Sequence, residues 1–134
     1  MKLNTISLAK VSLFFFGFIH FDHARSLIGI YETMTSAPSY LMFNVWHGLF
    51  FLLYGVLLIG TVLINNEKAF LMVAGVALIG VLIEAIGILT WISGFHVVYV
   101  LLNVVTAVVA TMLAANKVAL KVATEILNLE RSQF

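Results

Sequence analysis

Three side chains of this sequence combine the residue types of general acid–base chemistry with positions inside apolar segments. Glu84 is surrounded by Val, Leu, Ile and Ala, so its carboxyl group needs a partner away from lipid. His20 and His47 occur in two other apolar segments, and imidazole exchanges protons near neutral pH. A glutamate and a histidine that lie close together can act as a general acid–base pair. We therefore take Glu84, His20 and His47 as the candidate catalytic residues.

The remaining histidines, His23 and His96, complete a set of four imidazoles. His20 and His23 are three residues apart and share a helix face, a spacing at which two imidazoles can reach one metal ion. Such a pair needs further ligands, so we assign no metal ligand from the sequence, and the cofactor stays unknown. Haem b held by two histidines is another option, for which His20 and His47 form the best pair.

Polar and aromatic side chains near the histidines are the candidates for ligand binding. His96, Tyr99 and Asn103 follow one another at spacings of three or four, so they form a polar stripe on one helix face. Asn44 precedes His47 by three residues. The full candidate set is His23, Asn44, Trp46, His96, Tyr99 and Asn103.

The composition indicates a membrane protein. The 134 residues are 63% hydrophobic and 10% charged, whereas soluble domains average about 25% charged residues. The mean hydropathy is +1.13. A helix of about 20 apolar residues spans a bilayer, so the chain has room for four spans and little else. We predict an all-α fold, an integral membrane four-helix bundle that forms a single domain over residues 1–134.

Turn signals and basic residues predict the topology of the bundle. The expected spans are residues 9–30, 44–64, 69–92 and 95–115, followed by a tail over residues 116–134. Every Lys and Arg except Arg25 falls on one side of this arrangement, and cytoplasmic loops carry the excess of basic residues. Both termini are therefore expected in the cytoplasm, and all four histidines and Glu84 toward the opposite side.

Small residues predict how the spans pack, and a hydrophobic period predicts the form of the tail. Ala77, Gly80 and Gly87 share a face of the third span with Glu84, and small residues let helix backbones approach closely in membranes. Gly48 and Gly55 can serve the second span in the same way. The tail repeats apolar residues at helical spacing, so we expect a C-terminal amphipathic helix on the membrane surface. Its apolar positions are Val118, Val122, Ile126 and Leu129.

Several classes of protein are excluded. The net charge is +1 and there is no run of Lys and Arg, so we expect no nucleic-acid partner. The chain has no cysteine, which excludes disulfides and thiolate metal sites. It also lacks a P-loop, a nucleophile elbow, a dinucleotide-binding fingerprint and an HExxH zinc motif.

The layout resembles the DoxX-like group of small bacterial membrane proteins. The resemblance rests on the aromatic-Gly-aromatic run from Leu13 to His20 and on Trp46-His47-Gly48 at the start of the second span. It implies four spans, a bacterial plasma membrane and a quinone-linked redox role. The Lys or Arg that this group carries in its first span is replaced here by His20, and we transfer no catalytic residue from the group.

The leading functional hypothesis is a polar His/Glu pocket, toward the outer side of the membrane, that binds a small lipophilic ligand. The pocket could perform acid–base chemistry on the ligand, as in an isomerase, cyclase or hydrolase, or serve a quinone-linked oxidoreductase subunit. One alternative is a redox subunit that binds haem or a metal. Another is a non-enzymatic accessory subunit of a larger membrane complex. The expected partners are the lipid bilayer, the ligand, and either further copies of the chain or a membrane complex.

Overall fold

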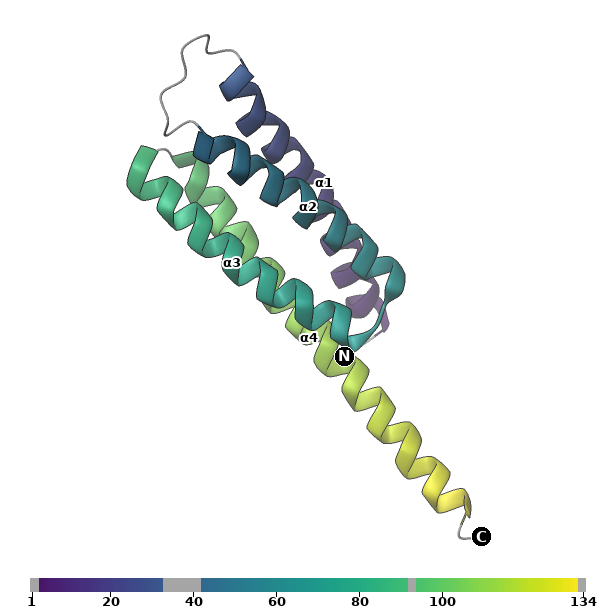
Figure 1. The fold of residues 1–134 in the computed structure, drawn as a ribbon. Coiled ribbons are helices and arrows are strands. Elements are labelled where there is room, and N and C mark those ends of the chain that lie inside the picture. The colour runs from purple at the N-terminus through teal and green to yellow at the C-terminus, as the bar shows by residue number, and fades with distance from the viewer. Residues whose placement is uncertain (1–2, 33–41, 92–93, 133–134) are drawn as a thin grey trace.

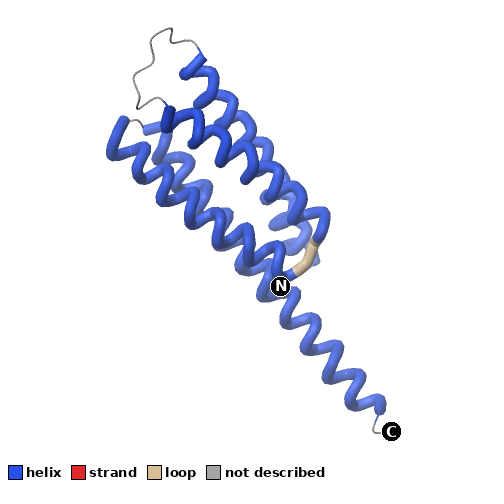
Figure 2. The backbone as a smooth tube through the Cα atoms, viewed as in Figure 1, coloured by secondary structure: helices blue, strands red, loops and turns tan. Residues whose placement is uncertain are grey.

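The structure, a computed structural model, describes residues 3–32, 42–91 and 94–132. In these residues the chain forms four α-helices and no strand (Figures 1 and 2). The helices are α1 (Leu3–Glu32), α2 (Met42–Ile64), α3 (Glu67–Trp91) and α4 (Gly94–Ser132). Each is long and apolar enough to cross a membrane. The predicted all-α four-helix bundle is confirmed, and the chain is a multi-pass membrane protein.

The helices alternate in direction, so both termini lie on the same side of the bundle (Figure 1). We call the end that holds the N-terminus and the α2–α3 turn the inner end, and the opposite end the outer end. The turn is short because Asn65 adopts a positive φ of 54°, a conformation that Asn tolerates better than most residues. The Asn66 side chain then caps α3 by accepting a hydrogen bond from the Ala69 amide at 2.8 Å.

Glycines bring the backbones of α1 and α2 into contact. A Cβ atom placed on Gly55 would lie 2.8 Å from the carbonyl oxygen of Gly17, and one placed on Gly17 would lie 2.9 Å from that of Gly55. A Cβ on Gly48 would lie 3.1 Å from the carbonyl oxygen of Ala24. The packing role predicted for Gly48 and Gly55 is confirmed, and Gly17 is their main counterpart on α1.

Small residues also join α3 to α4. Ala77 and Ala110 are fully buried, and Gly80 lies against the amide group of Asn103. The predicted small-residue face of the third span is therefore a packing face. The buried core runs between the two helix pairs. Its inner half is mainly apolar, with Thr61 as a buried polar residue, and its outer half holds the buried ionisable residues together with apolar ones such as Phe51. Large apolar side chains that are fully buried in the inner half include Leu13, Leu58, Phe70 and Val73.

Two boundaries differ from the sequence-based expectation. The first helix begins at Leu3, not near residue 9, because Lys10 lies half-buried within it and does not end it. The fourth helix continues without a break to Ser132 and projects past the other three (Figure 1). The helix predicted for the tail is present, but as an extension of α4 rather than as a separate element. No glycine or proline follows Ala115, so nothing in the sequence stops the helix there.

Candidate functional site

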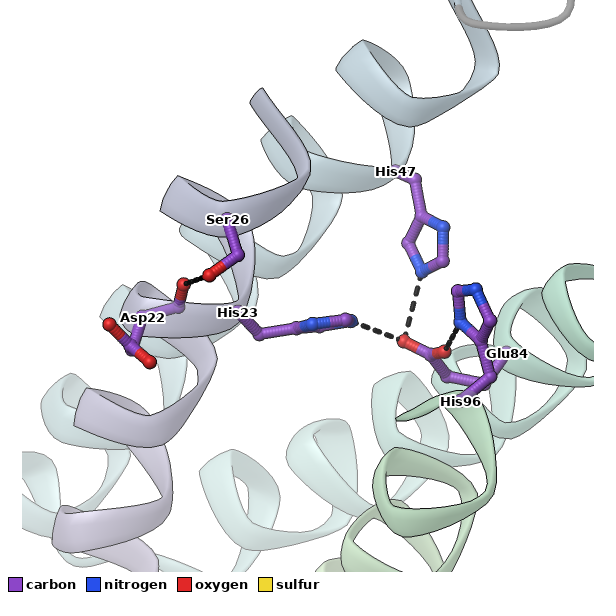
Figure 3. Close-up of polar contacts among 6 residues, drawn as sticks. All are labelled: Asp22, His23, Ser26, His47, Glu84 and His96. Atoms are coloured by element: carbon purple, nitrogen blue, oxygen red, sulfur yellow. Dashed lines mark hydrogen bonds and ion pairs between the residues drawn. The ribbon is translucent and has the colours of Figure 1, made fainter. Parts of the chain in front are cut away.

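Four ionisable side chains, one from each helix, meet in the outer half of the bundle (Figure 3). Nε2 of His23 on α1 donates a hydrogen bond to Oε1 of Glu84 on α3 at 2.6 Å. Nε2 of His47 on α2 reaches the same oxygen at 2.9 Å. Nδ1 of His96 on α4 reaches Oε2 of Glu84 at 2.5 Å. We call these four residues the Glu84 cluster.

The antiparallel arrangement explains how residues so far apart in sequence meet. His47 and His96 lie in the first two turns of α2 and α4, where both helices start at the outer end. His23 and Glu84 lie in the second halves of α1 and α3, which end there. Each helix therefore presents one cluster residue at about the same depth, and the expectation that His20 or His47 lies near Glu84 is confirmed for His47.

Gly87 makes room for one of these histidines. It lies one helical turn from Glu84 on α3, and a Cβ atom placed on it would be 2.8 Å from two atoms of the His96 ring. The sequence predicts a packing face for Gly87 but not this role beside the site. The only signal for that role in the sequence is the spacing of three residues between Gly87 and Glu84.

The cluster is closed off from the surroundings of the bundle. His23 and Glu84 are 0% exposed, His47 is 2% exposed and His96 is 6% exposed. The ion-pair partners of Glu84 within the described chain are these three imidazoles. An ionised Glu84 with three neutral imidazoles carries one net negative charge, and an uncompensated buried charge is strongly disfavoured. A proton on Glu84 or on an imidazole makes the cluster neutral, and a metal ion is another source of positive charge.

Aromatic rings fix the orientation of the imidazoles. The ring of Tyr99 stacks on that of His23, with centroids 3.5 Å apart and an interplanar angle of 17°. The rings of His47 and His96 stack with centroids 5.7 Å apart. Phe51 packs against both His23 and His47, with centroid distances of 4.9 and 5.1 Å. Side chains held in this way keep their nitrogen atoms directed at Glu84 without further rearrangement.

His20 is fully buried but makes no hydrogen bond to Glu84. Its ring lies one helical turn inward from His23, stacks on Phe51 with centroids 5.0 Å apart, and makes a tilted contact with Tyr54 at 4.6 Å. Its two ring nitrogens have no hydrogen-bond partner among the described residues. Phe51 packs against both His20 and His47, the pair considered for haem, and that option stays a prediction.

The other predicted ligand-binding residues divide between the core and the surface. Tyr99 and Asn103 are buried on the same face of α4 as His96, with Tyr99 touching the cluster and Asn103 one turn farther inward. Trp46 is 67% exposed, because consecutive residues on a helix point in different directions and its neighbour His47 faces the core. The structure therefore does not bring Trp46 to the cluster. The side chain of Asn44 lies outside the described residues.

The donor atoms converge as metal ligands do. One ligand atom each from His23, His47 and Glu84 lie within 4.8 Å of one another. In a tetrahedral zinc site with bonds of about 2.1 Å, the ligand atoms are about 3.4 Å apart. Small outward movements of the side chains would therefore turn this group into a coordination sphere of two nitrogens and one oxygen, next to which His96 contacts the second carboxylate oxygen of Glu84.

Comparisons with known proteins give no family for this chain. No family model matches it, and no curated protein and no solved structure is significantly similar to it. The DoxX-like resemblance stays a prediction.

Proposed function

We propose that this chain is a membrane-embedded metal-binding protein, with His23, His47, Glu84 and His96 as the ligands of one divalent transition-metal ion. The observation that carries the proposal is the convergence of three imidazoles on one buried carboxylate, with a donor from every helix. Imidazole nitrogens with one carboxylate oxygen suit Zn²⁺, Fe²⁺, Co²⁺ and Ni²⁺ better than Ca²⁺ or Mg²⁺, which prefer oxygen-only shells.

The donor atoms support a cation at this place. A divalent ion would satisfy the lone pairs of four buried groups at once, and it would bring the net charge of the cluster from minus one to plus one. Residues that hold the imidazoles, such as Tyr99 and Phe51, would then act as the supporting shell that orients metal ligands. Whether the metal is structural, redox-active or catalytic depends on its identity.

The test is metal content after mild detergent extraction, with an affinity tag that contains no histidine. We expect about one metal ion per chain by elemental analysis, and less than about a tenth of that in His23→Phe and Glu84→Gln. His20→Phe is the matched control, because it removes a buried histidine of α1 that lies outside the cluster. Helical circular dichroism confirms that each variant is folded. Folded wild-type protein that takes up none of Zn²⁺, Fe²⁺, Co²⁺ or Ni²⁺ would refute the proposal.

A proton-sharing cluster is the second candidate, favoured by the short hydrogen bonds of 2.5 and 2.6 Å to Glu84. Here a proton supplies the positive charge, and Glu84 with a histidine performs acid–base chemistry on a small lipophilic ligand. An apolar groove of about 330 Å³ between α3 and α4 could receive such a molecule. It is lined by Ala74, Leu78, Ala107 and Thr111, away from the cluster residues, which weakens this alternative. Mass spectrometry of small molecules that co-purify with metal-free protein would test it.

A further inference from the structure

The outward face of α1 carries two charges at a depth where the bilayer is apolar. Asp22 and Arg25 are exposed, and Asp22 is adjacent in sequence to His23 of the Glu84 cluster. Helix α3 rises about 22 Å from Ala69, at the inner end, to Glu84. Asp22 lies at about the depth of Glu84, because it is next to His23. In a hydrocarbon core of about 30 Å, Asp22 is therefore about 8 Å inside the outer boundary. Arg25 can extend toward the headgroups, but the short Asp22 side chain cannot.

Neither charge has a partner within the described chain. The ion pairs among the described residues join Glu84 to His23, His47 and His96. Asp22 and Arg25 take part in none of them. The Asp22 carboxylate points away from Glu84 in Figure 3, and only its backbone oxygen is engaged, by the Ser26 hydroxyl at 2.9 Å. The Asp22–Arg25 pair suggested by their spacing of three is thus not formed.

The two charges belong to a continuous stripe along α1. Its members recur at alternating spacings of three and four, the period of helices that pack in a left-handed supercoil. The apolar members are 49–67% exposed. Only 17% of the α1 span is buried in the bundle, against 39% of each of the other spans. The stripe consists of Leu8, Val11, Phe15, Phe18, Asp22 and Arg25.

We propose that this stripe is the interface with a second copy of the chain, packed α1 against α1. Two copies insert in the same direction, so their α1 helices run parallel about a two-fold axis, and the same stripe meets itself. In parallel packing with this period, each residue contacts its own counterpart and the members one step before and after it on the other helix. Asp22 of each copy then lies beside both Asp22 and Arg25 of the other, and the two carboxylates and two guanidinium groups form a neutral set that is removed from lipid. This proposal does not depend on metal binding.

Disulfide cross-linking tests the interface, since the chain has no native cysteine. Phe18→Cys lies on the stripe, and Leu53→Cys, on α2 at similar depth and 70% exposed, is the matched control. With a mild oxidant in native membranes, we expect a cross-linked dimer of Phe18→Cys at least about tenfold more abundant than that of Leu53→Cys. Equal yields, or a product with the mass of a different protein, would overturn the proposal whatever the metal content.

A charge exchange tests the ion pairs separately. In the Phe18→Cys background, Asp22→Arg places like charges together and should lower the yield about tenfold, whereas Asp22→Arg with Arg25→Asp should restore most of it. Asp22→Asn, which adds no charge, serves if Asp22→Arg fails to insert, and it should lower the yield less. If Arg25 instead binds lipid phosphate, the double exchange restores nothing and the paired arrangement is wrong.

Discussion

The inner and outer halves of this core are both buried, but only the outer half holds ionisable side chains. In the inner half, Leu13, Leu58 and Phe70 are 0% exposed, and in the outer half His23 and Glu84 are 0% exposed. Burial alone therefore does not separate the part that holds the fold from the part for which we propose a function. Replacing a buried charged network by apolar residues is often neutral or stabilising in proteins. We therefore expect the bundle to fold without the Glu84 cluster, and we propose that the cluster serves function and the inner half stability.

Separating α1 from α2 should have the largest effect, because both halves of the core depend on the contact between these helices. In Gly55→Leu the new side chain would meet Phe21 at 2.7 Å and the Gly17 carbonyl oxygen at 2.8 Å. We expect the free energy of unfolding to fall by about 3 kcal/mol, because α1 and α2 must move apart. Gly60→Leu is the control on the same helix, since a Cβ there has no atom within 4 Å. Unfolding in mixed micelles, followed by circular dichroism, measures both, and equal losses would contradict the close-packing account.

Glu84→Gln should lower metal affinity and leave stability nearly unchanged, whereas Leu58→Ala should lower stability and leave metal affinity nearly unchanged. Glu84→Gln removes the one anionic ligand, so metal affinity should fall at least about 100-fold, or about 2.7 kcal/mol. The metal-free variant should unfold within about 1 kcal/mol of wild type, since intramembrane hydrogen bonds contribute little on average. Leu58→Ala should lose about 2 kcal/mol of stability and keep its metal affinity within about threefold. Metal titration and unfolding on the same samples decide this, and a Glu84→Gln protein that binds metal normally would contradict the division.

Gly87→Ala adds one methyl group beside the Glu84 cluster and should lower metal affinity. The Cβ atom would meet the His96 ring at 2.8 Å and push its Nδ1 away from Glu84. We expect metal affinity to fall about tenfold, as for other changes that misplace a ligand. Gly75→Ala on the same helix has no atom within 4 Å of its Cβ and should leave the affinity unchanged. Isothermal titration of both variants tests this, and indistinguishable affinities would show that His96 is not held by this contact.

His20→Phe should have the smallest effect. It removes two buried ring nitrogens that have no partner in the described chain and keeps an aromatic ring against Phe51 and Tyr54. Burying an unsatisfied polar group costs about 1–3 kcal/mol, so the variant should be as stable as wild type or more stable by about 1 kcal/mol. The unfolding curve measures this. A clear loss of stability would contradict this expectation and would mean that His20 forms polar contacts with small molecules bound in the core.

The sequence predicts the fold because apolar length and basic-residue placement report directly on membrane spans. It also predicts that Glu84 faces the interior and that histidines gather at the outer end. It does not show whether His20 or His23 meets Glu84, since both share a face of α1. That choice depends on the rotation of α1, which the contact of Gly17 with Gly55 fixes across two helices. The convergence of His96 likewise depends on Gly87, a long-range fit that spacing alone does not specify.

X-ray absorption at the edge of the metal bound to the purified protein tests whether the Glu84 cluster holds that metal. We expect nitrogen and oxygen ligands at about 2.0–2.1 Å, with the more distant scattering of three imidazoles. His47→Phe should lose one imidazole from that pattern or lose the metal, and His20→Phe should leave the pattern intact. A shell without imidazole scattering, or one that His47→Phe leaves unchanged, would contradict the assignment of the Glu84 cluster as a metal site.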